Sequence, residues 1–255
     1  MDYIVIILLG AIWGSFANVC IHRLPRNQNV ITGRSKCPKC KKKILWHDNI
    51  PLLSFIYLQG RCRKCKKKIS FQYFIVELIS IISFVSLYYY IGVNLNTLYL
   101  IILSLIFIII FFIDLNHYII PDILNFSLMI IGFFKSFDPN LNTNLFPNYI
   151  NSIIGGILGY AVIWSIIYFY KQIRKKEGMG LGDAKLMGGI GFWFGWVSIP
   201  FIIFIASVIA LIFVAPSIIK KTRKMSSQIP FGPFIIIATL IYVHFIEQIK
   251  LLLSI

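Results

Sequence analysis

The run LYLIILSLIFIIIFFI, residues 98–113, decides what kind of protein this chain forms. It contains no charged side chain, and an acid, Asp114, follows it directly. A second run of the same kind, SIPFIIFIASVIALIFVA, occupies residues 198–215. Runs of this length match the roughly 30 Å hydrocarbon core of a bilayer. With 58% hydrophobic residues and a mean hydropathy of +0.81, the chain is predicted to be an all-α polytopic membrane protein.

The apolar segments along the chain predict about eight transmembrane helices. We place them at residues 3–20, 71–91, 97–113, 119–135, 149–170, 183–197, 199–218 and 232–250. Residues 1–21 then form the first transmembrane helix, residues 22–70 a small cytoplasmic insert, and residues 71–255 the transmembrane core. No basic region precedes the first apolar segment, which predicts a retained helix with its N-terminus outside.

The chain carries a net charge of +16, and the positions of its basic residues predict its orientation. Residues 23–68 hold 14 of the 25 Lys and Arg, and further clusters lie at 171–185 and 220–224. The candidate loops at 92–97 and 138–148 hold none. This alternation follows the positive-inside rule, so the basic segments are expected to face the cytoplasm and its anionic lipid. The pattern predicts a lipid bilayer as partner and no nucleic acid, and it gives no sign of an oligomeric state.

Two CxxC pairs lie in the insert, CPKC at 37–40 and CRKC at 62–65, separated by 21 residues. Each pair places two thiolates on one tight turn, and four sulfurs complete the tetrahedral shell that Zn²⁺ prefers. Cytoplasmic thiols stay reduced, which argues against the alternative of two disulfides. Cys20 lies at a helix end and is expected to be a packing residue. We predict a structural zinc site whose ligands are Cys37, Cys40, Cys62 and Cys65.

Acidic side chains are scarce, and four of the nine fall at or just within the predicted inner face: Glu77, Asp114, Asp122 and Asp183. An acid at the centre of a transmembrane helix costs roughly 2.5–3.5 kcal/mol on insertion scales, so such acids indicate a functional site. Asp114 and Asp183 come from different helix ends at similar predicted depth. Two carboxyls that meet in a poorly hydrated site cannot both ionise. Such a pair can act as acid and base toward one water, as in an aspartic protease.

Spacing alone leaves other interpretations of these acids open. Separate acids that cap helix ends or pair with Lys185 and His117 fit the residue types as well. A proton-coupled transporter, in which Asp114, Asp183 and Glu77 form a relay, is a second candidate function. A zinc-ribbon membrane adaptor would account for the cysteines alone. Against the transporter, the acids cluster near one membrane face, and we find no convincing inverted repeat or pair of broken helices.

The segment GMGLGDAKLM, residues 178–187, surrounds Asp183 with glycines. Glycine permits close backbone approach, so Gly180 and Gly182 are expected to admit an extended substrate chain beside this acid. Lys185 of the same segment is expected to be a supporting charge.

These motifs together resemble one known family, the type IV prepilin peptidases of the GxGD intramembrane aspartic proteases. FIDLNHYIIPD, residues 112–122, and GMGLGDAKL look like that family's pair of aspartate motifs. The two CxxC pairs fall in the family's order, as do the segments GSFANVCIHRLP (14–25), DNIPLLSF (48–55), VEL (76–78) and IPFGPF (229–234). The resemblance covers essentially the whole chain.

The resemblance implies an enzyme of the bacterial inner membrane that cuts prepilins or pseudopilins after the Gly that ends a short basic leader, at the cytoplasmic face. It assigns the catalytic aspartates to Asp114 and Asp183, with Asp122 in support. Many members also methylate the new N-terminal amine from S-adenosylmethionine, and the zinc insert is associated with that activity. The amine must first lose a proton, and Glu77 is the candidate base, with a purely structural acid as the alternative. No dinucleotide-type glycine fingerprint locates the methyl-donor site.

Overall fold

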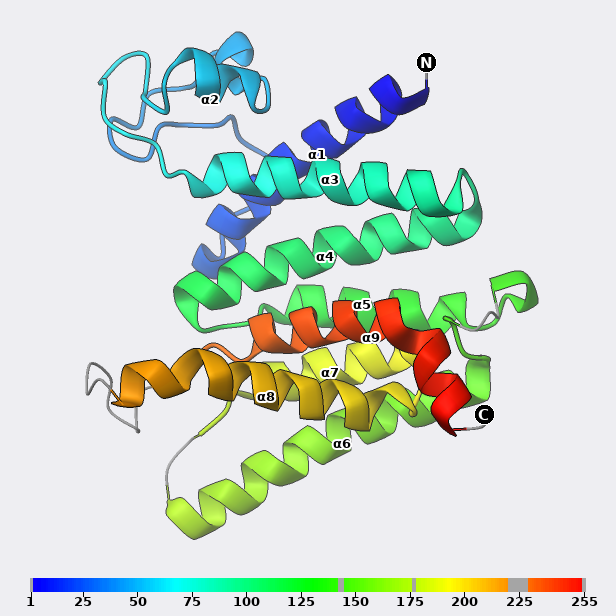
Figure 1. Ribbon diagram of the computed structural model, residues 1–255. Helices are drawn as coiled ribbons and strands as arrows, with labels where there is room; N and C mark the ends of the chain where they lie inside the picture. Colours follow the sequence, from blue (N-terminus) through cyan, green and yellow to red (C-terminus); the bar gives the residue numbers. More distant parts are fainter. Residues whose placement is uncertain (1, 142–144, 176–177, 220–228, 254–255) are drawn as a thin grey trace. The chain divides into compact units, whose positions relative to one another are not determined.

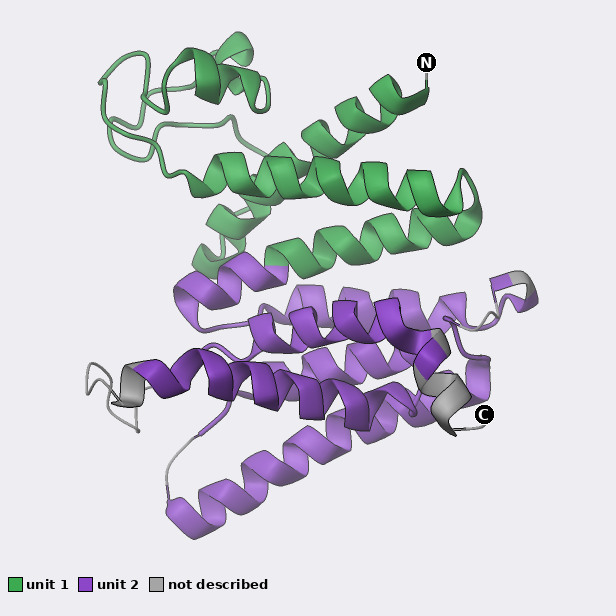
Figure 2. Ribbon diagram, viewed as in Figure 1, with its two compact units in different colours: residues 1–109 green, residues 110–255 purple. Residues whose placement is uncertain are grey.

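The computed structural model describes residues 2–141, 145–175, 178–219 and 229–253, and it divides the chain into two compact units, residues 1–109 and 110–255 (Figure 2). Regular structure in the described ranges is helical, apart from two isolated β-bridges. The long helices are α1 (Asp2–Arg23), α3 (Gln72–Ile91), α4 (Leu95–His117), α5 (Asp122–Lys135), α6 (Tyr149–Arg174), α7 (Leu181–Phe194), α8 (Ser198–Ile219) and α9 (Gly232–Leu253) (Figure 1). Short elements are η1 (Leu24–Arg26), η2 (Trp46–Asn49), α2 (Leu53–Tyr57) and η3 (Pro139–Leu141). The predicted all-α class is confirmed.

The long helices differ from the predicted ones by one to four residues at one or both ends, among them α4, α5 and α7. Helix α4 continues to His117, so Asp114 lies inside its last turn and not just beyond the helix. Helix α5 begins at Asp122 and not at 119, since Pro121 forces extended backbone before it. Helix α7 ends at Phe194 and not at 197, because Gly195 follows in the left-handed region with φ of 79°. The predicted inner cluster 220–224 lies outside the described residues.

In unit 1, α1 packs against α3 through small residues of α1 (Figure 1). A Cβ added at Gly10 would lie 2.8 Å from the Cα of Ile81, and one at Gly14 would lie 2.9 Å from the Cα of Glu77. Small residues allow two backbones this close, as is common between membrane helices. The crossing places Glu77 against the N-terminal helix.

In unit 2, α7 is the central helix, packed against α5, α6, α8 and α9. Its side chains are buried on nearly all sides, which is the property of a core helix. Glycines of α6 permit the closest contact: a Cβ at Gly155 would lie 2.5 Å from the carbonyl oxygen of Gly191, and one at Gly159 would lie 2.6 Å from that of Met187. This packing fixes the helix whose first turn carries Asp183.

Among the described residues, five helices are long and apolar enough to cross a bilayer. They are Asp2–Arg26, Gln72–Ile91, Leu95–His117, Tyr149–Arg174 and Ser198–Pro216, and Gly232–Ile246 is a shorter apolar helix. Helices α5 and α7 have 14 residues each, so each is about 21 Å long, less than the hydrocarbon thickness. A multi-pass membrane protein is supported, and the count of eight spans stays a prediction.

The topology predicts that the loop after α5 faces the outside and the end of α6 faces the cytoplasm. Pro139→Cys in that loop should react with a membrane-impermeant maleimide on intact cells. The matched variant Arg174→Cys, at the end of α6, should react only after permeabilisation. Labelling of Arg174→Cys on intact cells, with Pro139→Cys protected, would reverse the orientation.

Candidate active site

Asp114 is a buried acid in the last turn of α4, with 4% of its surface exposed. Its Oδ2 accepts a hydrogen bond of 2.9 Å from the backbone N–H of Gly232, 118 residues away and the first residue of α9. The carboxyl is therefore held from outside its own helix. A buried carboxyl needs such a partner, because an unsatisfied one would lose its solvation.

Asp183 is a second buried acid, 8% exposed, in the first turn of α7. Gly180 is the N-cap of this helix, and the backbone N–H of Asp183 donates to its carbonyl oxygen at 3.2 Å. An acid in the first turn of a helix is stabilised by the unpaired N–H groups there. The carboxyl of Asp183 interacts electrostatically with that of Asp114.

Ile120, in the turn between α4 and α5, lies against the first residues of α7 and of α9. Its Cβ is 3.1 Å from the position of a Cβ at Gly182, and its Cδ1 is 3.1 Å from that of a Cβ at Gly232. Gly182 directly precedes Asp183, and Gly232 donates to Asp114. One apolar side chain therefore contacts the residue before Asp183 and the residue that donates to Asp114, although the two acids are on helices far apart in the sequence.

Asn125 of α5 contacts the same segment and was not predicted from the sequence. Its side chain is fully buried, and Nδ2 donates to the carbonyl oxygen of Gly182 at 3.3 Å. Its Oδ1 is buried and has no hydrogen-bond partner among the residues that the structure describes. The contact holds the start of α7 to α5.

Asp122 and Lys185 form an ion pair of 2.6 Å between α5 and α7. The Asp122 side chain is 60% exposed and that of Lys185 25% exposed. An exposed pair of this kind contributes little to stability, at most about 1 kcal/mol. Asp122 therefore differs from the two buried acids, and it links the start of α5 to the start of α7.

The four predicted metal ligands come together in unit 1. The sulfur atoms of Cys37, Cys40, Cys62 and Cys65 all lie within 4.8 Å of one another. The Sγ atoms of Cys37 and Cys65 are 3.8 Å apart, the edge of about 3.8 Å expected when four thiolates surround zinc at about 2.3 Å. None of these cysteines is in a disulfide, and Cys20 lies buried elsewhere on α1. The donor set and its spacing fit a structural zinc ion.

The two CxxC turns have the same backbone hydrogen bonds and conformation, which was not predicted from the sequence. The N–H of Cys37 donates to the carbonyl of Lys42, and that of Cys62 donates to the carbonyl of Lys67. The residue after each pair, Lys41 or Lys66, has positive φ. The repeat CPKCKKK (37–43) and CRKCKKK (62–68) was the available signal.

The DNIPLLSF segment (48–55) forms hydrogen bonds both within the insert and to α3. The Arg63 guanidinium binds both oxygens of Asp48, with contacts of 2.7–3.0 Å, and these hydrogen bonds hold the pKa of the Asp48 carboxyl below its usual value. Four residues on, the N–H of Leu52 donates to Oε2 of Glu77 at 2.8 Å. Leu52 has φ of 57°, a costly conformation for a bulky residue and one that often occurs at functional sites.

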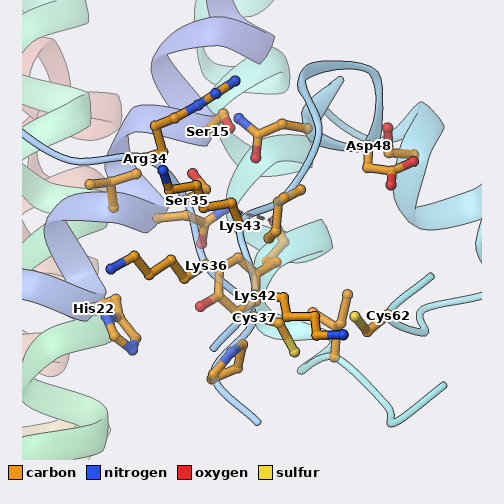
Figure 3. A pocket seen from close by; sticks show the side chains of 18 of the residues that line it. Ser15, His22, Arg34, Ser35, Lys36, Cys37, Lys42, Lys43, Asp48 and Cys62 are labelled. Atoms are coloured by element: carbon orange, nitrogen blue, oxygen red, sulfur yellow. Dashed lines mark hydrogen bonds between the residues drawn. The ribbon is translucent and has the colours of Figure 1, made fainter. Parts of the chain in front are cut away.

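Unit 1 contains a cavity of about 720 Å³ (Figure 3). Glu77 is one of the residues that line it. Only 8% of this residue is exposed, and the side chains of Ser15 and Asn18 of α1 lie near its carboxyl. The cavity is otherwise rich in basic side chains, with Arg34, Lys36, Lys42 and Lys43 around it, and two of the predicted metal ligands, Cys37 and Cys62, also line it (Figure 3). Its volume is within the usual range of about 300–1,000 Å³ for small-molecule sites.

Comparison with known proteins decides the family. The model of the type IV leader peptidase family matches residues 101–215, and the bacterial peptidase A24 N-terminal domain matches residues 8–91. A prepilin leader peptidase/N-methyltransferase of Aeromonas salmonicida is 33% identical, over 91% of this chain and 87% of its own length. The chain belongs to the type IV leader peptidase family.

Further relatives carry the same description. That of Pseudomonas aeruginosa is 30% identical over 95% of this chain and 90% of its own length, and that of Klebsiella pneumoniae is 35% identical over 78% and 88%. No solved structure matches the chain. The predicted family is thus confirmed, and the transporter alternative is not favoured. Asp114 and Asp183 fall within the matched peptidase region, and the four cysteines and Glu77 fall within the matched N-terminal domain.

Proposed function

We propose that this chain is a membrane-embedded aspartic endopeptidase that removes the basic leader of type IV prepilins or pseudopilins. It cuts after the leader's Gly at the cytoplasmic face of the inner membrane. The observation that carries the proposal is the pair of buried acids, Asp114 and Asp183, gathered from two helices inside the region that matches a peptidase family. The exposed, ion-paired Asp122 serves as a supporting residue.

The two carboxyls share one proton in the proposed reaction. The ionised carboxyl takes a proton from a water, whose oxygen attacks the scissile carbonyl carbon, while the protonated carboxyl gives its proton to the carbonyl oxygen. In the second step, the carboxyl that took the water's proton gives it to the nitrogen as the C–N bond breaks. The other carboxyl, now ionised, takes a proton from one hydroxyl of the tetrahedral intermediate, whose oxygen becomes the carbonyl of the new C-terminus, and the shared proton is restored. The packing of α7 keeps Asp183 in place for both steps.

The glycine segment before Asp183 supplies room for a substrate backbone. Gly180 is exposed, and the nearest heavy atoms to a Cβ added there would be Oδ2 of Asp183 and the nitrogen of Gly182, both at 3.9 Å. An extended chain laid here would pass beside the Asp183 carboxyl, and a Gly at the cut site would meet little obstruction. The basic leader would stay in the cytoplasm by the charge rule that orients the enzyme itself.

The peptidase proposal is tested with the purified protein in detergent and a prepilin-type substrate. N-terminal sequencing of the product should begin at the residue after the leader's Gly. A matched substrate with Leu in place of that Gly should be cut at least about tenfold more slowly, because its side chain crowds the site. Equal cleavage of both substrates, or a cut at another bond, would contradict the proposed specificity.

The proposal includes N-methylation of the released N-terminus with S-adenosylmethionine, which supplies the methyl group. The cavity beside Glu77 suits this molecule, since its volume suffices and Arg34 or Lys36 can bind the donor's carboxylate. Leu52 occupies Oε2 of Glu77, so Oε1 is the atom proposed to take the proton from the substrate's ammonium group. The names of the relatives support this second activity.

Glu77→Gln separates a base from a purely structural acid. Gln keeps an oxygen acceptor for the Leu52 N–H, but it cannot take a proton. We expect methylation to fall by about 10²–10⁴-fold while cleavage stays near the wild-type rate. Mass spectrometry of the product measures both. If Glu77→Gln methylates as well as wild type, Glu77 is a structural acid and the base lies elsewhere.

A further inference from the structure

The IPFGPF segment (229–234) has no role in the proposed reaction, but it contains the start of α9, which contacts the buried Asp114. Gly232, the first residue of α9, donates its N–H to Oδ2 of Asp114 at 2.9 Å. Both residues are buried. Gly232 lies beyond residues 101–215, the part of the chain that matches the peptidase family.

Among the first N–H groups of α9, that of Gly232 is the one that donates to Asp114, and the local sequence explains why. Pro233 has no N–H, and the N–H groups of Phe234 and Ile235 both donate to the carbonyl oxygen of Phe231, at 3.0 and 3.1 Å. A side chain at this position is also excluded on steric grounds. A Cβ on Gly232 would lie 2.7 Å from Oδ2 of Asp114 and 3.1 Å from Cδ1 of Ile120.

The start of α9 also offsets an unfavourable electrostatic position. Asp114 lies in the last turn of α4, where the helix dipole disfavours a negative charge. The N-terminus of α9 presents the opposite end of a dipole, with a hydrogen bond from its first N–H. Within the described ranges, the carboxyl of Asp183 on α7 is the ionisable group that interacts with Asp114. Without α9, Asp114 would face an acid and the negative end of its own helix.

We propose that Gly232 is a positioning residue for Asp114, which fixes Oδ2, favours the ionised carboxylate and leaves Oδ1 for the attacking water. The hydrogen bond itself is independent of the reaction, whereas its catalytic consequence rests on the proposed peptidase function. The test therefore has one arm that needs no activity and one that does.

Selective isotope labelling isolates the Gly232 amide. In a protein labelled with carbonyl-¹³C Phe and ¹⁵N Gly, only the Phe–Gly peptide bonds give signals, and the sequence has them at Phe194–Gly195 and Phe231–Gly232. Gly195 is an internal control, because its N–H donates to the backbone carbonyl of Gly191. We expect the Gly232 amide proton to move downfield with rising pH as Asp114 ionises, and the Gly195 signal to stay constant. Asp114→Asn should abolish this titration, whereas Asp183→Asn should preserve it.

The activity arm uses Gly232→Ala, with Leu240→Ala on the exposed face of α9 as control. The added methyl displaces the Asp114 carboxyl, so kcat should fall about 100-fold at little-changed KM, and Leu240→Ala should match wild type. A Gly232 amide that does not titrate, or that titrates equally in Asp114→Asn, would overturn the inference even if the chain cleaves prepilins. Wild-type protein without peptidase activity would instead contradict the proposed function, and the NMR arm would still decide the hydrogen bond.

Discussion

Asp183→Asn should abolish prepilin cleavage in a protein that remains folded, and Asp114→Asn should do the same. Asparagine fills nearly the same volume as aspartate, but it can neither take a proton from the water nor return one to the leaving amine. We expect either substitution to lower kcat by at least about 10²–10⁴-fold, the usual contribution of one acid or base. Because the two carboxyls act as one unit, the double variant should be no worse than either single one.

Asp122→Asn is the matched control for these variants. It makes the same chemical change eight residues after Asp114, but at a side chain that is 60% exposed and paired with Lys185. We expect cleavage within a few-fold of wild type, because an exposed ion pair contributes only about 0–1 kcal/mol. Appreciable cleavage by Asp114→Asn or Asp183→Asn would remove that residue from the catalytic pair. Complete loss in Asp122→Asn would move a catalytic role to the exposed acid.

Removal of zinc should unfold the cytoplasmic insert and abolish methylation. The purified protein should contain about one zinc per chain, bound by four thiolates. Zinc contributes about 10–16 kcal/mol of binding free energy in zinc-finger peptides, which exceeds what so small an insert can gain from its own core. Metal analysis measures the zinc, and hydrogen exchange measures the amides of Cys37 and Cys62, which bond to Lys42 and Lys67 in the intact turns.

Cys20→Ser provides the control for the cysteine variants, since Cys20 is buried on α1 outside the cluster. Cys37→Ser and Cys62→Ser should each lose the metal and the amide protection, and Cys20→Ser should keep both. A protein that is zinc-free as purified, with protected amides in the insert and active methylation, would reduce the four cysteines to a minor structural role.

The four-cysteine cluster and the buried acids could be predicted from the sequence, for physical reasons that act locally. A CxxC pair positions both sulfurs on one turn whatever the rest of the chain does, so two pairs imply a tetrahedral site. An acid at the end of an apolar run must be compensated, which singled out Asp114 and Asp183 among nine acids. The membrane class followed from the length of the apolar runs alone.

The partners of these acids could not be predicted, because they depend on contacts between distant helices. The Gly232 donor is 118 residues from Asp114, and nothing in IPFGPF by itself indicates a hydrogen bond to an acid. The buried Asn125 and the strained Leu52 likewise acquire meaning only from the groups that they touch. The burial of Lys135 could not be predicted either, because it depends on a contact with a distant residue. Lys135 is fully buried at the end of the helix predicted at 119–135, and its Nζ lies 3.4 Å from the centre of the Phe146 ring.

One intact-mass experiment tests the proposed catalytic role of the buried acids: a prepilin-type substrate is incubated with purified wild-type protein, Asp183→Asn or Asp122→Asn, each with and without S-adenosylmethionine. With wild type and Asp122→Asn, we expect the substrate to lose the mass of its leader, cut after Gly. We expect it to gain the mass of one methyl group only when S-adenosylmethionine is present. Asp183→Asn should leave the substrate intact in both conditions. Leader removal by Asp183→Asn at the wild-type rate, or no cleavage by folded wild type across several such substrates, would contradict the central claim.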